Sequence, residues 1–103
     1  MYTHLHIQPG LYSPSSPLTH YNAVECSPLE YFEGNTEVIA EAEWQRDPKA
    51  DYFWSVYLHF DPSISEGRGS ECVADFTTKE SAQAYANGLE LALRSVVGSR
   101  FIP

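Results

Sequence analysis

The sequence has few basic residues and no long apolar run. Six Lys and Arg stand against fourteen Asp and Glu among 103 residues, which gives a formal net charge of −8 at pH 7. The bases are scattered, so no basic patch offsets the repulsion between this chain and a phosphate backbone. We therefore expect no direct binding to nucleic acid. No apolar stretch reaches the roughly 18 residues of a membrane-spanning helix, so we expect no membrane association.

Cysteine is also scarce. The two cysteines, Cys26 and Cys72, are far apart and belong to no C-x-x-C motif. This spacing excludes a zinc knuckle and a dithiol redox motif, and we expect free, buried thiols. A reactive Cys26 is a weaker alternative, because a helix that starts after it would lower the pKa of its thiol. The polar N-terminal residues do not form a signal peptide, so we expect a cytoplasmic protein.

What is present is typical of one folded domain. The composition is 43% hydrophobic and 14% aromatic, which is enough for a core and argues against global disorder. We expect a single domain over residues 1–103. Within it, residues 8–22 form a Pro- and Ser-rich loop, for which mobility is one interpretation.

Alternation of apolar residues with period two predicts four strands, and helical spacing predicts two helices. The stretch Ser27-Pro28-Leu29-Glu30 resembles a capping box, and Gly34 provides a stop, which predicts a short helix near residues 28–33. A second capping box, Thr77-Thr78-Lys79-Glu80, precedes a long amphipathic helix, in which Gly88 suggests a close approach to the sheet. The predicted strands are Tyr2–Ile7, Thr36–Trp44, Tyr52–Phe60 and Glu71–Phe76.

These elements predict an α+β fold. We expect an antiparallel sheet of three to four strands, with the long C-terminal helix on one face and the short helix near residues 28–33. Both faces of Tyr52–Phe60 are largely apolar or aromatic, so we expect a central strand, or a second face covered by a partner or by the Pro-rich loop.

The acidity is concentrated in the first part of the chain. Residues 1–45 contain six Glu and no Lys or Arg. Carboxylates with interspersed aromatic side chains suit a basic partner, so we expect a non-enzymatic protein that binds a basic protein, for example a nucleic-acid-binding complex. An acidic surface that only confers solubility is the other interpretation. The residues expected to form the partner-binding surface are Glu30, Glu33, Glu37, Glu41, Glu43 and Tyr57.

The most concrete version of this hypothesis is an inhibitor that occupies the nucleic-acid-binding surface of its target. In size and charge the chain is similar to phage-encoded anti-CRISPR and anti-restriction proteins, although no motif identifies a family. Two alternatives stay open. The His4-x-His6 pair is a weak candidate for metal binding, as a small metalloprotein or enzyme, and the second face of Tyr52–Phe60 suits a homodimer or larger homo-oligomer. The sequence contains no catalytic motif, and we expect no cofactor.

Overall fold

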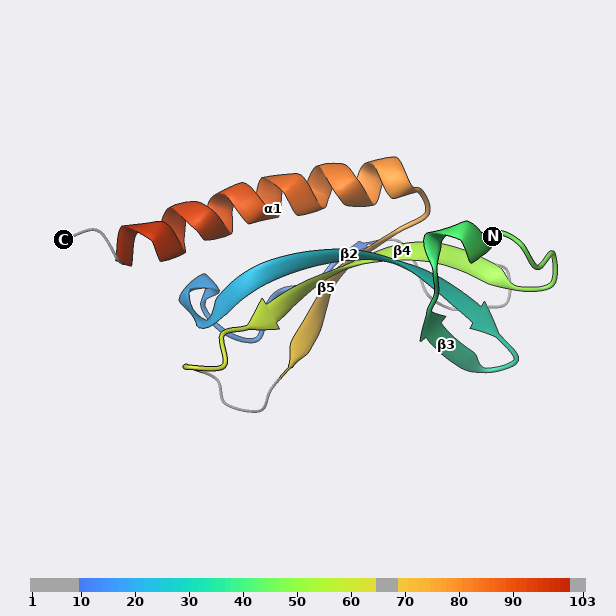
Figure 1. Ribbon diagram of the computed structural model, residues 1–103, viewed down its shortest axis with the longest axis horizontal. Helices are drawn as coiled ribbons and strands as arrows, with labels where there is room; N and C mark the ends of the chain where they lie inside the picture. Colours follow the sequence, from blue (N-terminus) through green and yellow to red (C-terminus); the bar gives the residue numbers. More distant parts are fainter. Residues whose placement is uncertain (1–9, 65–68, 101–103) are drawn as a thin grey trace.

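A five-stranded antiparallel sheet with one long helix on one face forms the protein (Figure 1). The computed structural model describes residues 10–64 and 69–100. The strands lie in the order β1-β5-β4-β2-β3. Two short 3-10 turns, η1 and η2, lie in the connections. The bounds are β1 Gly10–Leu11, η1 Leu18–His20, β2 Tyr21–Phe32, β3 Asn35–Val38, η2 Glu41–Glu43, β4 Asp51–Phe60, β5 Ser70–Phe76 and α1 Lys79–Arg100.

The α+β class, the antiparallel sheet and the C-terminal helix are confirmed. The sheet has five strands in the described residues, not three to four. The additional strands come from segments with weak or conflicting local signals: Gly10–Leu11 lies in the predicted loop 8–22, and β2 was hidden by helix-capping residues. The predicted strand Tyr2–Ile7 lies outside the described residues.

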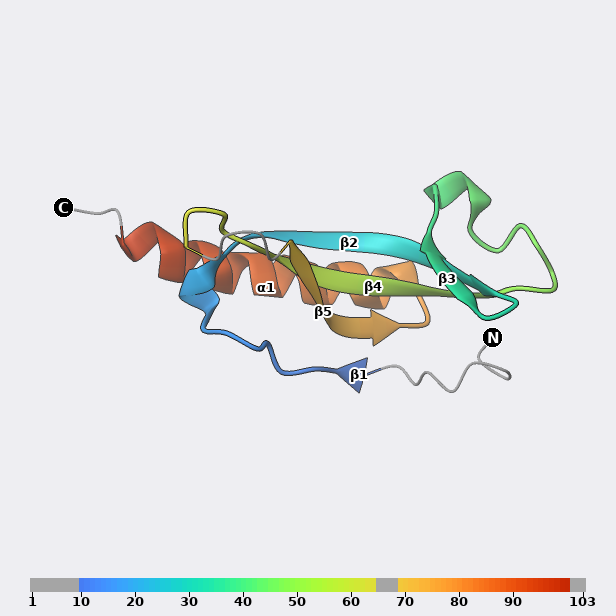
Figure 2. The same ribbon diagram turned by 90° about the horizontal axis from the view of Figure 1, so that it is seen from below.

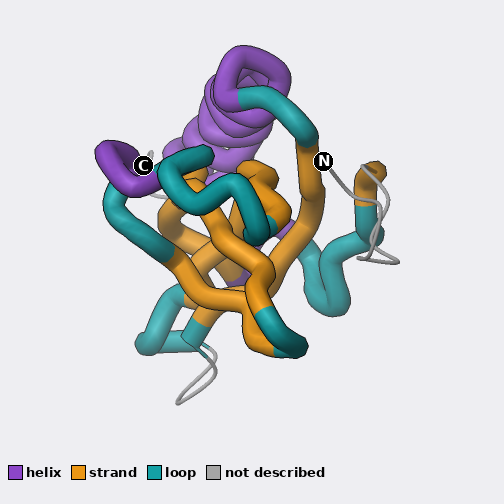
Figure 3. Tube along the Cα trace, turned by 90° about the vertical axis from the view of Figure 1, so that its right-hand side faces the viewer, coloured by secondary structure: helices purple, strands orange, loops and turns teal. Residues whose placement is uncertain are grey.

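The central strand is β4, as its apolar pattern predicts. It pairs with β2 on one side and with β5 on the other. Even-numbered residues of β4 point toward α1 and form the main core, whose buried members include Val56 and Leu58 at 0% exposure. Figure 3 shows, end on, that the helix covers only one side of the curved sheet.

The predicted short helix over residues 28–33 is wrong, because these residues belong to β2. Glu33 and Gly34 have φ values of 49° and 86° and form the two-residue loop of a hairpin between β2 and β3. Positive φ at both central residues is the geometry that joins twisted antiparallel strands tightly. The Pro28 carbonyl accepts a hydrogen bond from the Ile39 N–H, on the side of β2 that faces away from β4. The backbone nitrogen of a strand residue points to the same side as its carbonyl. The N–H that proline lacks is therefore not needed for pairing with β4, and Pro28 is tolerated.

The predicted strand Thr36–Trp44 is also corrected, because β3 ends at Val38 and the chain then forms η2. Backbone hydrogen bonds from Glu43 to Ala40 and from Trp44 to Glu41 close this turn. Ala and Glu are good helix formers, so local preference favours the turn once pairing with β2 has ended. As a result, Glu37, Glu41 and Glu43 do not share one strand face.

The N-cap of α1 is Thr78, one residue later than Thr77, the cap that the predicted capping box implies. The Thr78 hydroxyl accepts a hydrogen bond from the Ser81 N–H at 3.2 Å, which makes Thr78 the N-cap. Ala82, Ala86 and Leu93 bury the apolar stripe of the helix against the sheet. A Cβ atom built on Gly88 meets no atom within 4 Å. The suggested close approach of the sheet at Gly88 is therefore wrong.

Candidate interaction surface on the β2–β3 hairpin

Two carboxylates face each other across the β2–β3 ladder. Glu30 and Glu37 are Cα partners, and Glu33 lies in the turn that joins the strands. The Tyr52 hydroxyl donates a hydrogen bond of 2.8 Å to Glu30 Oε1 and orients that carboxylate. Glu30 pairs with Tyr52 across β2 and β4, so Glu30 and Glu37 lie on the face of the sheet that carries α1. We call residues 29–38 the acidic hairpin.

The turn and β3 side of the acidic hairpin is exposed, Glu30 is half-buried, and residues 29–38 contain no Lys or Arg. Figure 1 shows the acidic hairpin extending beyond the N-terminal end of α1, so the long helix does not cover it. All four residues of β3 are exposed, and Val38 is 57% exposed. Within the described part of the chain, Glu30, Glu33 and Glu37 form no ion pair, and no strand pairs with the outer edge of β3.

A small polar hollow lies between the two strands of the acidic hairpin. Its volume is about 170 Å³, and Glu30, Phe32, Asn35 and Glu37 line it. It places the aromatic ring of Phe32 beside the paired carboxylates. This is the combination of charge and apolar area that a basic side chain with an aliphatic stem can contact.

The other two predicted glutamates are compensated by bases of the same chain. Glu41 forms an ion pair with Lys79 at 2.5 Å, and Glu43 forms one with Arg46 at 3.0 Å. The Glu41 carboxylate raises the pKa of Lys79. Both pairs are solvent-exposed and weak. Glu41 and Glu43 nevertheless each have a counter-charge, unlike the glutamates of the acidic hairpin.

Tyr57 lies on the opposite face of the sheet from Glu30 and Glu37. Residues of β4 alternate between faces, and Tyr57 pairs with Glu25 of β2 and Cys72 of β5. Burial is the main cause that raises the pKa of Tyr57, and the nearby Cys72 contributes. The structure therefore does not bring Tyr57 together with the carboxylates of the acidic hairpin.

Figure 2 shows, from below, the face of the sheet that α1 leaves open. The strand register places a band of polar side chains across this face. We call it the polar band. Directly paired residues of neighbouring antiparallel strands share a face, which brings groups from β2, β4 and β5 together here. Its members are Glu25, Ser27, Ser55, Tyr57, His59, Cys72 and Asp75, with Tyr12 added from the segment after β1.

Asp75 is the centre of one half of the polar band. It is 7% exposed and accepts hydrogen bonds from the hydroxyls of Tyr12, at 2.8 Å, and Ser55. The Cys72 thiol donates to it at 3.5 Å. Burial and the Asp75 charge raise the pKa of Cys72 to about 11, so this thiol is protonated and unreactive at neutral pH.

Glu25 is the centre of the other half. His59 Nε2 lies 2.6 Å from Glu25 Oε1, and the Ser27 hydroxyl donates to Glu25 Oε2. The Ser27 hydrogen bond is the main cause that lowers the pKa of Glu25. A serine nucleophile needs a hydrogen bond to its base. Ser27 donates to the Glu25 carboxylate and not to His59, so Ser27, His59 and Glu25 do not form the Ser–His–carboxylate chain of a catalytic triad.

The period-two pattern of β4 puts Tyr57 and His59 on one face, but the sequence alone did not predict the polar band. The period-two spacing of Glu25, Ser27 and Leu29 would have placed these residues on one face of a strand. It was not used, because residues 28–33 were interpreted as a helix. Cys26 lies on the core side of β2 and is a free cysteine like Cys72. Burial raises the pKa of Cys26, which disfavours the reactive thiolate considered above.

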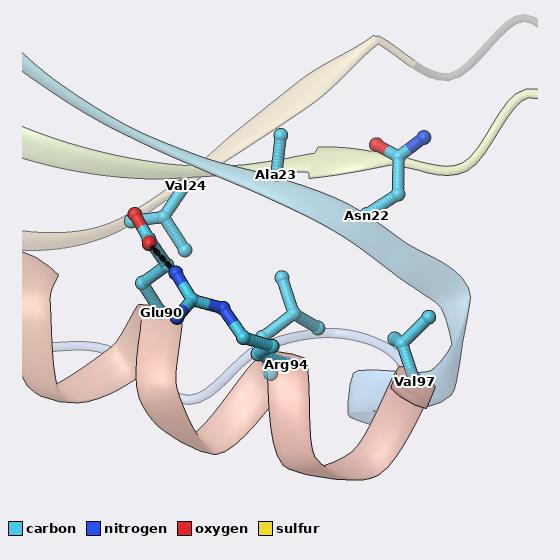
Figure 4. Close-up of a pocket in the computed structure, with 7 residues that line it drawn as sticks. Asn22, Ala23, Val24, Glu90, Arg94 and Val97 are labelled. Carbon is cyan, nitrogen blue, oxygen red and sulfur yellow. Dashed lines mark hydrogen bonds and ion pairs between the residues drawn. The ribbon is translucent and has the colours of Figure 1, made fainter. Parts of the chain in front are cut away.

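A cavity lies between β2 and the C-terminal half of α1 (Figure 4). Its volume is about 460 Å³. The two charged residues that line it, Glu90 and Arg94, form an ion pair with each other. These charges neutralise one another, so the cavity does not favour a charged ligand. Its other lining residues are Asn22, Ala23, Val24, Leu93 and Val97.

The described residues include no group of three or more His, Cys, Asp or Glu side chains arranged to hold a metal ion. His4 and His6 lie outside them, so the metal hypothesis for this pair stays a hypothesis. None of the helices in the described ranges combines the length and apolar character of a membrane span. Comparisons with protein families, curated proteins and solved structures find no match for this chain.

Proposed function

We propose that this protein binds a basic protein surface through the acidic hairpin and thereby inhibits a nucleic-acid-binding target. The observation that carries the proposal is the direct pairing of Glu30 with Glu37, on an exposed hairpin without a counter-charge in the described residues. Like charges placed directly opposite each other destabilise a strand pair. A Lys- or Arg-rich partner relieves this repulsion and gains electrostatic complementarity.

The edge of β3 provides a second means of contact. Its outer backbone groups pair with no strand in the described ranges. An extended segment of a target can add to such an edge through main-chain hydrogen bonds, while its side chains determine specificity. The acidic hairpin combines this edge with three carboxylates, so a basic extended segment is the partner that fits it.

The amount of charge limits how the inhibition works. Four residues of β3 span about 13 Å, a length over which duplex DNA carries about eight charges. The acidic hairpin has three carboxylates, so it does not copy a duplex. It competes instead for one local basic patch, which is sufficient to block nucleic acid at that patch.

The test is capture of targets from the source cell or its host by tagged protein, with washes of rising salt concentration. We expect a basic nucleic-acid-binding protein that salt releases, because screening weakens exposed charge pairs. The charge reversals Glu33→Lys and Glu37→Lys should each abolish its capture, and an added oligonucleotide should displace it.

Glu90→Lys is the control for net charge, because it makes the same charge change on the exposed surface of α1. Circular dichroism checks that loss of the Glu90–Arg94 ion pair leaves the variant folded. Capture should persist with this variant. Equal loss with Glu37→Lys and Glu90→Lys would show a dependence on net charge alone. Retention of the target by both hairpin variants would contradict the proposal.

A further inference from the structure

A second feature of the molecule has the chemistry of a cation site. A hollow of about 390 Å³ lies where η2 meets the start of α1, on the helix side of the sheet. Figure 1 shows η2 and α1 on the same side of the sheet. We call this hollow the tryptophan pocket. Its lining residues are Glu41, Trp44, Gln45, Trp54, Thr77, Thr78, Lys79 and Glu80.

The aromatic walls of the tryptophan pocket are held in place by their own contacts. The rings of Trp44 and Trp54 lie 5.9 Å apart between centroids, at an angle of 54°. The Trp44 indole N–H donates a hydrogen bond of 3.2 Å to the Phe53 carbonyl, and its ring packs edge-on against Tyr52. Trp54 is 3% exposed. The two rings thus form a preorganised corner of the pocket.

The chain places its own ammonium group in this corner. Lys79 Nζ lies 5.7 Å from the centroid of the Trp54 ring and 2.5 Å from Glu41 Oε2. An aromatic face and a carboxylate both attract an ammonium ion in proteins. Lys79 and Glu41 are 43% and 60% exposed, so water reaches the pair and its contribution is small. An incoming cation with further contacts can displace Lys79.

Tyr52 links the tryptophan pocket to the acidic hairpin. Glu30 accepts a hydrogen bond from Tyr52, and Tyr52 packs against Trp44. These contacts connect the carboxylates of the hairpin to the wall of the pocket on one face of the sheet. Glu41 and Glu80 keep the pocket acidic when Lys79 leaves it. A basic partner that contacts both sites would therefore bind the same face of the sheet.

We propose that the tryptophan pocket binds a lysine side chain of the target, which displaces Lys79 from Trp54 and Glu41. This inference rests on the proposed function, because it supplies the specific anchor for a basic partner. Lys79 then acts as an internal competitor that occupies the pocket in the free protein. It lowers the affinity for weak basic partners and leaves the site to those that make additional contacts.

The test uses the two tryptophans as reporters. The chain contains two Trp residues, and both line the pocket, so a change in tryptophan emission reports on this site. The probe is a short capped peptide of alternating lysine and serine, and the same peptide with norleucine in place of lysine is its control. We expect the lysine peptide to change the emission and to bind Lys79→Met about fivefold more tightly than wild type, because the competitor is gone.

Matched variants separate the pocket from general electrostatics. Glu41→Gln should weaken binding of the lysine peptide, whereas Glu43→Gln removes an exposed carboxylate outside the pocket and should weaken it less. Lys49→Met removes an exposed base elsewhere and controls for Lys79→Met. Circular dichroism and thermal unfolding check that each variant is folded.

The outcomes distinguish this inference from the proposed function. Peptide binding without a change in tryptophan emission, and with equal affinities for Lys79→Met and Lys49→Met, would overturn the pocket inference. The acidic hairpin would then still be the binding surface. Failure of the peptide to bind Lys79→Met would overturn the inference as well. Target capture with the Glu37→Lys variant decides the proposed function separately.

Discussion

Glu30 and Glu37 are direct Cα partners across the β2–β3 ladder, and neither forms an ion pair within the described residues. The register that creates this pair follows from the two-residue turn at Glu33 and Gly34. The tight turn thus places two negative charges opposite each other at an exposed edge. The repulsion between these charges reduces the stability of the free protein. A cation bound beside them would relieve that repulsion.

The first prediction is that Glu37→Lys stabilises the fold while it abolishes target binding. The new ammonium lies opposite Glu30, so repulsion becomes attraction, and the free energy of unfolding should rise by about 0.2–1 kcal/mol. Denaturant unfolding measures this change, and the capture experiment measures binding. Loss of stability in this variant would contradict the observed register. Unchanged binding would contradict the role of the acidic hairpin.

The second prediction concerns Gly88 in α1. A Cβ atom there enters open space, and the residue is exposed in the middle of the helix. Gly88→Ala should therefore raise the free energy of unfolding by about 0.5–1 kcal/mol, because Ala loses less backbone entropy on folding and favours helix. Thermal and denaturant unfolding provide the measurement. A decrease in stability would show that the backbone of α1 lies closer to a neighbour than described.

The third prediction tests the helix cap at Thr78. Its hydroxyl accepts a hydrogen bond from the Ser81 N–H, which otherwise has no partner in the first turn. Thr78→Ala should lower the free energy of unfolding by about 1 kcal/mol, whereas Thr77→Ala should have a smaller effect. The reverse order in denaturant unfolding would place the cap at Thr77, as the sequence pattern alone suggests.

Long, regular segments were predictable from the sequence. The central strand β4 and the helix α1 have apolar periods that extend over many residues, so their local pattern agrees with their final packing. The region of β2 around Pro28 was not predictable in this way, because Ser27, Glu30 and Gly34 satisfy the rules for a short helix. Pairing with β4 along the whole of β2 outweighs this local preference.

The composition of the candidate surface was only partly predictable, for a different physical reason. Glu30, Glu33 and Glu37 were expected to bind a partner, and the structure brings them together. Whether Tyr57 shares their face depends on strand register, which their positions in the sequence do not determine. The contact between Glu41 and Lys79 joins residues 38 positions apart, so only the folded chain shows that this charge is compensated.

The fourth prediction is a loss of stability at alkaline pH that depends on Tyr12. Its hydrogen bond to Asp75 is the main cause that raises the pKa of Tyr12 from 10.0 to about 12. The folded protein therefore holds this phenolic proton more tightly than the unfolded chain does. The resulting stabilisation is complete below the unfolded pKa and is lost as pH rises through the folded pKa.

Tyr12→Phe isolates this effect from the other tyrosines. The variant should lose about 0.5–1 kcal/mol at neutral pH, since one donor to Asp75 is removed. It should then lose less additional stability than wild type as pH rises from 10 to about 12. Tyr85→Phe removes a hydroxyl away from Asp75 and serves as the control. Parallel alkaline profiles for wild type and Tyr12→Phe would contradict the prediction.

The fifth prediction is that both thiols react slowly in the folded protein. The thiolate is the reactive form, and the pKa of Cys72 is raised from 9.0 to about 11, which reduces its thiolate fraction about a hundredfold near neutral pH. Burial also raises the pKa of Cys26, and the nearby Lys79 charge opposes that rise. In a spectrophotometric assay with an aromatic disulfide reagent, Cys26→Ala, which retains Cys72, should therefore react more slowly than Cys72→Ala. Both should react rapidly in denaturant, and equal rates in the folded and unfolded states would show that Asp75 and burial do not protect Cys72.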